Sequence, residues 1–275
     1  MRLFFLGTAA AEGYPGIFCN CANCRQARLL GGRNLRLRSA LLVNDDLLID
    51  FGPDLLASAL RFNLSLWSVT TGLVTHAHSD HFFPGNFGMR ADAFTGKLPP
   101  PNLRLYGPKD VADMLEADFP DLEALHLESH TVHAFDTWKS GRYTISAYRA
   151  FHAVESLEAL FYSIDDGRHA CLYATDTGLF PEDTRQALTG RSFDVIILEE
   201  TLGSGQYTQH LGFDTFREQL EWMCKEGLLR PGGRVFAHHM SHSNNPSHEK
   251  LEEIFSPQAV EVAYDGLEIV LDGSR

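Results

Sequence analysis

The sequence predicts an α+β fold in which two β-sheets are covered by helices. The chain has 275 residues, which is close to the upper limit for one hydrophobic core. No polar linker or change of composition divides it, so we expect one domain over residues 1–275. Strand-like apolar runs dominate both halves, and segments with helical spacing follow them. This order favours two helix-covered sheets over a purely parallel sheet.

The expected elements follow one another from the N-terminus. Strands are expected at 3–6, 39–43 and 47–51, the last two joined by the turn 44–46. Residues 54–62 have helical spacing of apolar side chains, 72–75 form a short buried strand, and 108–119 form a helix with proline in its first turn. Later strands are expected at 143–151, 159–164, 170–175, 195–199, 234–237, 260–263 and 267–271, and helices at 181–188, 213–226 and 247–255.

Composition limits the classes of partner. There are 36 acidic and 23 basic side chains, and the formal net charge of −13 repels polyanions, so we expect no general nucleic-acid binding. No apolar run approaches the ~20 residues that a membrane span needs. Three of the five cysteines, Cys19, Cys21 and Cys24, are close together, which favours a metal cluster in a reducing cytoplasm over a disulfide framework. Base rates alone make a homodimer the default assembly.

The strongest chemical signal lies in residues 75–81, Thr-His-Ala-His-Ser-Asp-His, directly after a short apolar strand. Imidazole and carboxylate are ligands that borderline divalent metals prefer. On an extended segment His76 and His78 point to the same side, and a turn into a helix would bring Asp80 and His81 toward a second ion. A polar loop that merely contains histidines is the simpler alternative, but this density of ligand-type residues is costly beside an apolar strand.

The motif His76-x-His78-x-Asp80-His81 resembles the signature of the metallo-β-lactamase superfamily. The resemblance implies a four-layer αβ/βα sandwich, with two mixed sheets flanked by helices and a two-metal site between them. Its ligand set is matched in order by further residues, namely Asp50, His152, Asp176 and His239. The family pattern implies that one divalent ion is held by His76, His78 and His152, and the other by Asp80, His81 and His239. Asp176 would bridge the two ions, and Asp50 would orient the histidine loop. Two such ions activate water for hydrolysis, and manganese and zinc both suit the ligands.

Each of the dispersed matches has a simpler explanation when it is taken alone. Asp176 suits a cap for the helix expected at 181–188, and Asp50 suits a turn before Gly52. His130 and His133 compete with His152, which alone lies directly between two strand-like runs. His238 competes with His239.

The segment Cys19-Asn20-Cys21-Ala22-Asn23-Cys24 supplies three thiolates at a spacing suited to a structural tetrahedral zinc, which needs a fourth ligand. Buried reduced cysteines are the alternative, but the flanking asparagines are poor core residues. In the superfamily branch that the chain resembles, the fourth ligand is a histidine three positions after the last active-site histidine. The spacing His239-Met240-Ser241-His242 therefore assigns His239 to the active site and His242 to the zinc.

The segment 7–15, the cysteines and the arginine-rich stretch 33–39 resemble the PhnP-like phosphodiesterase branch, which acts on a ribose cyclic phosphate. We therefore expect a dinuclear-metal-dependent phosphodiesterase that hydrolyses small cyclic or nucleotide-like phosphate diesters. Two alternatives remain. One is an RNA-processing endonuclease like tRNase Z, although no long Gly/Pro-rich arm is evident. The other is a protein like pyrroloquinoline quinone biosynthesis protein B, with structural zinc only.

Two further residues are candidates for contact with substrate. Residues 194–201 followed by His210 resemble a feature shared with tRNase Z, in which a histidine donates a proton near the scissile phosphate. This makes His210 the candidate general acid, beside Asp80 and Asp176 as catalytic carboxylates. The alternative is a surface histidine in the polar loop 203–212. Arg90 is a candidate for binding a phosphate oxygen, with a solvated arginine as an equal alternative.

Overall fold

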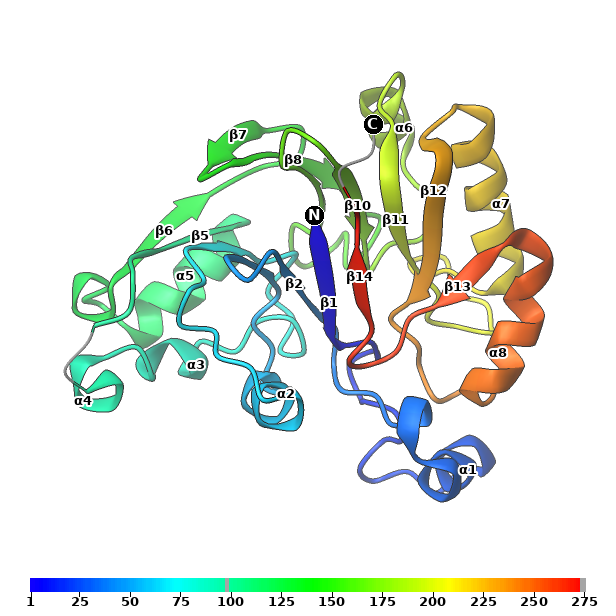
Figure 1. The fold of residues 1–275 in the computed structure, drawn as a ribbon, viewed down its shortest axis with the longest axis horizontal. Coiled ribbons are helices and arrows are strands. Elements are labelled where there is room, and N and C mark those ends of the chain that lie inside the picture. The colour runs from blue at the N-terminus through cyan, green and yellow to red at the C-terminus, as the bar shows by residue number, and fades with distance from the viewer. Residues whose placement is uncertain (97–98, 273–275) are drawn as a thin grey trace.

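A computed structural model describes residues 1–96 and 99–272, which fold into two β-sheets packed face to face (Figure 1). Within the described residues, the first sheet has seven strands in the order β14-β1-β2-β3-β4-β5-β6. Its strands are β1 (Arg2–Gly7), β2 (Ala40–Val43), β3 (Leu47–Ile49), β4 (Thr71–Leu73), β5 (Leu103–Gly107), β6 (Leu127–Thr131) and β14 (Glu268–Val270). Pairing is antiparallel from β14 to β3 and parallel from β3 to β6, so the sheet is mixed.

The second sheet also has seven strands in the described part of the chain, in the order β13-β12-β11-β10-β9-β8-β7. They are β7 (Thr137–Ser140), β8 (Tyr143–Arg149), β9 (Leu160–Asp165), β10 (Ala170–Ala174), β11 (Phe193–Glu199), β12 (Leu229–His238) and β13 (Val260–Val262). The strands β10 to β13 run parallel, and β7 to β10 are antiparallel. The central strands β10 and β11 are buried along almost their whole length, as their apolar sequences require.

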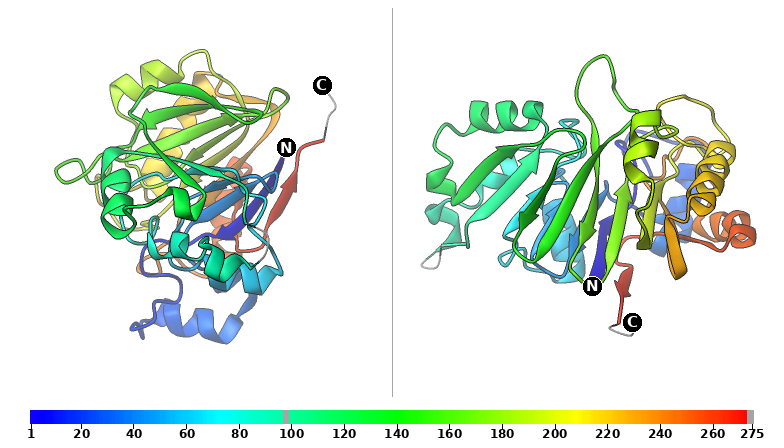
Figure 2. Two further views of the ribbon diagram at one scale, coloured as in Figure 1. Left: turned by 90° about the vertical axis from the view of Figure 1, so that its left-hand side faces the viewer. Right: turned by 90° about the horizontal axis from the view of Figure 1, so that it is seen from above.

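Helices cover the outer face of each sheet (Figures 1 and 2). On the first sheet they are α2 (Leu55–Phe62), α3 (Gly85–Gly88), α4 (Asp92–Thr95) and α5 (Lys109–Asp118), and on the second α6 (Glu182–Leu188), α7 (Phe213–Lys225) and α8 (His248–Phe255). Short 3-10 turns lie at Gly32–Asn34, Glu123–Leu125 and Ser256–Gln258. One apolar cluster, with Phe5, Tyr162 and Phe236, fills the space between the sheets, and two others lie under the helices. The predicted four-layer αβ/βα sandwich is therefore confirmed.

The differences from the expected elements are local. The sequence analysis missed β5, β6 and β7. Residues Leu127–Thr131 and Thr137–Ser140 carry polar side chains on partly exposed strands and show no apolar run. The strand β5 is mostly buried, but it has only five residues and an arginine interrupts its apolar side chains. The expected strand 47–51 ends at Ile49, because Asp50 adopts a left-handed φ of 65°. Within the described residues, no helix is long and apolar enough to cross a membrane.

The helix α1 (Ala22–Leu30) stands apart from the four layers (Figure 1). It follows β1 in the chain and projects from the end of the molecule at which β1 and β12 finish. The Met240 N–H donates to the Thr8 carbonyl and so joins the segments that follow β12 and β1, and the Tyr14 N–H donates to the Arg36 carbonyl and so joins the two segments that flank α1. The cysteine segment is therefore an appendage whose base is fixed to the core.

Candidate active site and metal centres

The candidate ligands gather where parallel strands of both sheets end. Asp50 follows β3, Asp176 follows β10 and His239 follows β12. All three adopt left-handed backbone conformations, with φ of 65°, 48° and 63°. Such conformations are unfavourable for residues other than glycine and are concentrated at functional sites. Asp50 and His239 come directly after the last residue of their strands, and Asp176 lies two residues after the end of β10.

The first group of ligands consists of His76, His78 and His152. Nδ1 of His78 lies 3.0 Å from Nε2 of His76 and 3.1 Å from Nε2 of His152. Burial lowers the pKa of His76 well below its usual value and also lowers that of His152, so both rings are neutral at pH 7. Three imidazoles whose nitrogens converge in this way can offer their lone pairs to one metal ion.

The second group consists of Asp80, His81, Asp176 and His239, all buried. Oδ2 of Asp176 lies 2.5 Å from Nε2 of His81 and 3.1 Å from Nε2 of His239. Nε2 of His81 is also 3.0 Å from Oδ2 of Asp80. Despite these short distances, Oδ2 of Asp176 and both Nε2 atoms have no hydrogen-bond partner of acceptable geometry. Buried polar atoms that face one another in this way fit a metal ion between them.

The same contacts hold the carboxylates ionised. Burial alone would raise the pKa of Asp80, but the adjacent His81 lowers it below its usual value. Burial opposes ionisation of Asp176 as well, and His239 and His81 together lower its pKa well below the usual range. Both groups are therefore anionic, as metal ligands must be.

Residues behind the ligands fix their orientation. Asp50 accepts hydrogen bonds from the Thr75 backbone N–H at 2.9 Å and the Thr75 hydroxyl at 3.0 Å, and its Oδ2 lies 2.7 Å from Nδ1 of His81. With Nδ1–H bound to Asp50, it is Nε2 of His81 that faces Asp80 and Asp176, where a metal ion would take the place of its proton. The Thr201 hydroxyl donates to Glu199 and lies 2.9 Å from Nδ1 of His239, which fixes the same tautomer there. Asp50 therefore lies behind the histidine loop, where the sequence analysis expected it.

His210 lies beside both groups. Its Nδ1 is 3.1 Å and 3.3 Å from the two carboxylate oxygens of Glu199 and 3.6 Å from Oδ1 of Asp176. Burial would lower the pKa of His210, but the negative charge of Glu199 raises it to about 9. The sequence analysis did not single out Glu199 as the partner of His210, although Glu199 lies in the segment 194–201 that pointed to His210.

The loop that carries His210 is attached to both neighbouring ligand loops. The side-chain oxygen of Gln209 accepts a hydrogen bond from the Ala153 N–H at 2.6 Å, next to His152. At Gly178, two residues after Asp176, a Cβ atom would stand 2.0 Å from the Thr208 carbonyl oxygen, so only glycine allows this approach. The loop is thereby held over the ligands.

These groups open into a cavity of about 480 Å³. Its lining residues are Ala10, Ala11, Glu12, His78, Asp80, His152, Asp176, Thr201, Leu202, His210, His239, Ser241, Ser243 and Asn244. Arg90 does not line it. The Arg90 guanidinium instead donates to the carbonyl oxygens of Leu125, Pro101 and His126 at 2.6–3.1 Å, which holds the loop before β5 against the turn before β6. The structure therefore places Arg90 outside this cavity, with its guanidinium bound to backbone carbonyl oxygens.

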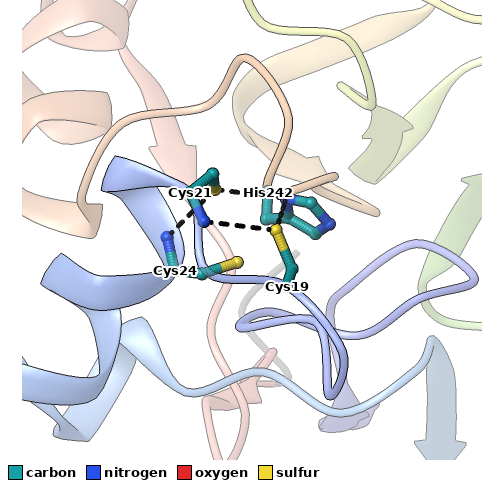
Figure 3. Close-up of side chains that lie close together, drawn as sticks. All are labelled: Cys19, Cys21, Cys24 and His242. Atoms are coloured by element: carbon teal, nitrogen blue, oxygen red, sulfur yellow. Dashed lines mark hydrogen bonds between the residues drawn. The ribbon is translucent and has the colours of Figure 1, made fainter.

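The second candidate centre lies at the start of α1, where Cys19, Cys21, Cys24 and His242 converge (Figure 3). Nδ1 of His242 is 3.8 Å from Sγ of Cys19 and 3.7 Å from Sγ of Cys21. The four ligand atoms all lie within 4.8 Å of one another. The Cys24 N–H donates to Sγ of Cys21, and this bond chiefly lowers the pKa of Cys21 to about 6. Three sulfurs and one imidazole nitrogen fit a tetrahedral zinc.

The competing histidines lie elsewhere. His238 is buried, its Nε2 lies 3.2 Å from the Gly7 carbonyl oxygen, and burial lowers its pKa to about 3. The His130 ring stacks on Tyr106, and His133 lies beside Glu158. The structure thus brings together every predicted metal ligand and His210, while Arg90 lies outside the site.

Comparison with known proteins places these findings in a family. The model of the beta-lactamase superfamily domain matches residues 46–263. Among solved structures, a diphosphatase of the PhnP family is similar, with a TM-score of 0.75 at 24% identity over 98% of this chain and 97% of that one. Zinc-bound PqqB from Methylobacterium extorquens has a TM-score of 0.74 at 18% identity, covering 98% and 100%. The short form of human tRNase Z has a TM-score of 0.67 at 19% identity, covering 99% and 100%.

A comparison with curated protein sequences finds no significant match. The superfamily match spans most of the chain, so it confirms the predicted superfamily and, with it, the metal-dependent hydrolase as enzyme class. The solved structures are less than 25% identical to this chain and show the shared fold alone.

Proposed function

We propose that this chain, which belongs to the beta-lactamase superfamily, is a dinuclear-metal-dependent phosphodiesterase acting on small cyclic or nucleotide-like phosphate diesters. The observation that carries the proposal is the position of His210. His210, which contacts the buried Glu199, lines the same cavity as two adjacent groups of residues that could bind metal ions. An acid beside a metal pair suits cleavage of a phosphate diester, because protonation speeds the departure of a poor leaving group such as a sugar oxygen.

The residues have distinct roles in this proposal. His76, His78 and His152 would hold one divalent ion, and Asp80, His81 and His239 the other, with Asp176 between them. When bound, the two ions would supply an activated water and neutralise charge on the phosphate. Asp50 and Thr201 keep the histidine rings in the tautomer that presents Nε2 to the ions. The donor set suits manganese or zinc.

His210 would protonate the leaving oxygen of the substrate. Its Nδ1 is engaged by Glu199, so the other ring nitrogen, Nε2, remains to carry the proton. Glu199 is itself fully buried and accepts a hydrogen bond from the Thr177 N–H at 2.8 Å, so the acid is held in one orientation. A fixed acid contributes about 10²–10⁴-fold to the rate of such reactions.

Outside the cavity, we propose that Cys19, Cys21, Cys24 and His242 hold one structural zinc in a protein of the reducing cytoplasm. That ion would join the appendage around α1 to the segment that follows His239. The geometry of three cysteines and Nδ1 of His242 supports this role.

The two alternative functions fit the cavity less well. An RNA-processing endonuclease must attract a long polyanion, whereas none of the described lining residues is lysine or arginine and the chain carries a formal charge of −13. A protein with structural zinc only would have no use for seven converging histidine and aspartate side chains at a second place. The cavity volume of about 480 Å³ favours a small substrate.

The test uses the full chain loaded with Mn²⁺ or Zn²⁺. We expect hydrolysis of bis(p-nitrophenyl) phosphate and of a 2′,3′-cyclic nucleotide, and Asp80→Ala should abolish both. The matched control is Asp118→Ala, an exposed aspartate on α5 that should keep full activity. A protein that ignores every diester but cleaves thioesters or lactones would overturn the proposal. Cleavage of precursor transfer RNA with strong salt dependence would favour the endonuclease.

A further inference from the structure

The side chains that line the proposed catalytic cavity include several carboxylates. Besides Asp80 and Asp176, which would face the metal ions, the lining includes a third carboxylate, Glu12. None of the described residues that line the cavity is lysine or arginine. Sites that bind a phosphate carrying two or more negative charges commonly supply arginine or lysine for the additional charge. In its described lining, this cavity presents a carboxylate without an arginine or lysine, and its positive charge would come from His210 and the two metal ions.

Glu12 is held at the cavity wall from two directions. Its Oε1 accepts a hydrogen bond from the Ser241 hydroxyl at 2.5 Å and lies 3.7 Å from Nε2 of His242. The backbone nearby is fixed by the bond from the Ala10 N–H to the Met240 carbonyl at 3.1 Å. The Glu12 side chain is 35% exposed, so its charge is only partly screened by solvent. Its position therefore does not depend on a bound substrate.

The arginines of the neighbouring segment do not neutralise this carboxylate. Arg36 is buried and donates to the Thr8 hydroxyl and the Ala263 carbonyl oxygen. Arg38 pairs with Asp54 at 2.9 Å and donates to the Ala11 carbonyl oxygen at 2.7 Å. Glu12 thus adds one negative charge to the cavity.

We propose that Glu12 is a specificity-determining residue that makes the site select singly charged phosphate diesters over phosphate monoesters and diphosphates. This rests on the proposed phosphodiesterase function. A diester carries one negative charge, whereas a monoester at pH 8 carries two. The extra charge of the monoester enters a cavity whose wall carries the Glu12 carboxylate, and like charges repel more there than in bulk water.

The first test is the ratio of kcat/KM for bis(p-nitrophenyl) phosphate to kcat/KM for p-nitrophenyl phosphate at pH 8. We expect Glu12→Gln to shift this ratio about tenfold toward the monoester. Glu12→Asp, which keeps the charge, should leave the preference for the diester. The control Glu221→Gln removes one charge from exposed surface on α7 and should leave the ratio unchanged. The ratio does not depend on the fraction of active protein, so any loss of zinc through His242 does not affect it. An unchanged ratio in Glu12→Gln refutes the proposal.

The second test measures binding without turnover, by calorimetry on the metal-loaded protein. Inorganic phosphate is the doubly charged probe at pH 8 and dimethyl phosphate the singly charged probe. Glu12→Gln should bind inorganic phosphate about tenfold more tightly and dimethyl phosphate unchanged. Equal changes for both probes, or none, refute the charge selection. If this shift occurs but the wild type cleaves no diester, the phosphodiesterase proposal fails while the role of Glu12 stands. If diesters are cleaved without the shift, only the role of Glu12 fails.

Discussion

The two candidate metal centres are built in opposite ways. The histidine and aspartate ligands come from segments between residues 76 and 239, at the ends of strands in both sheets, and nearly all of them are buried. In the cysteine centre, three ligands come from the six residues 19–24 and the fourth from His242, and only Cys24 is fully buried. Partners such as Asp50 and Thr201 orient the histidines of the first centre. Around the cysteines, the corresponding partners are the N–H groups of their own segment.

This difference separates chemistry from scaffolding. The sheets and their apolar clusters already hold the ligands of the first centre in place. A metal ion bound there would therefore add little to the stability of the fold, and its role would be to act on a substrate. The cysteine segment has a small apolar cluster of its own, Ala9, Tyr14 and Ala27, so a metal must supply much of its order. Both centres meet on the segment 239–242, which carries one ligand of each.

The largest effect that tests this comparison is expected from Asp176→Asn. The amide keeps the volume but loses the charge between His81 and His239, so the paired site should lose metal and kcat/KM should fall by about 10³-fold or more. Because the sheets hold the site, the melting temperature should change little and the cysteine centre should keep its zinc. Metal analysis and calorimetry of the purified variant measure both. Loss of zinc from the cysteines as well would show that the two centres form one cooperative unit.

A smaller effect is expected within the first centre from Glu199→Gln. His210 acts as an acid only while protonated, and the charge of Glu199 raises its pKa to about 9. Removing that charge lowers the pKa of His210, so the alkaline limb of the pH profile should move to lower pH and kcat should fall about 10²-fold. The variant His210→Gln gives the residual kcat in the absence of this acid. Glu158→Gln, in the exposed pair with His133, is the matched control. A normal profile in Glu199→Gln would remove His210 from the proton transfer.

The two centres also differ in how far the sequence predicted them. The ligands in 76–81 and 19–24 lie close together in the chain, so their residue types and spacing identify them directly. His152, Asp176 and His239 were assigned by family resemblance. Arg90 was chosen because it lies near the histidine loop in sequence, but in the fold its guanidinium binds backbone carbonyls outside the cavity. Glu199 and Glu12 were missed for a related reason. The roles proposed for them rest on contacts across the fold with His210 and Ser241, which no local pattern encodes.

The cysteine centre should respond in stability where the first centre responds in activity. Cys19→Ser removes one sulfur that faces His242 without touching the first turn of α1. We expect loss of one zinc per chain and a fall of about 2 kcal/mol in the free energy of unfolding. Chelation of the wild type should cause a similar loss. Cys224→Ser, at an exposed free cysteine, is the matched control. Full stability without zinc would mean that the apolar cluster alone holds the appendage.

The smallest effect concerns the base of the appendage, where the buried Asp265 accepts hydrogen bonds from the Thr8 hydroxyl at 2.8 Å and the Leu37 N–H at 2.6 Å. Burial outweighs these bonds and raises the pKa of Asp265 from 3.8 to about 6. The native state therefore holds a proton that the unfolded chain releases, so stability from this group is lost as pH rises from about 4 to about 6. Asp265→Asn cannot titrate, so over this window the wild type should lose on the order of 1–2 kcal/mol relative to the variant. Urea denaturation of both proteins at several pH values measures the difference, in which titration of the cysteine centre cancels. A difference that is constant with pH would mean that Asp265 ionises as it does in the unfolded chain.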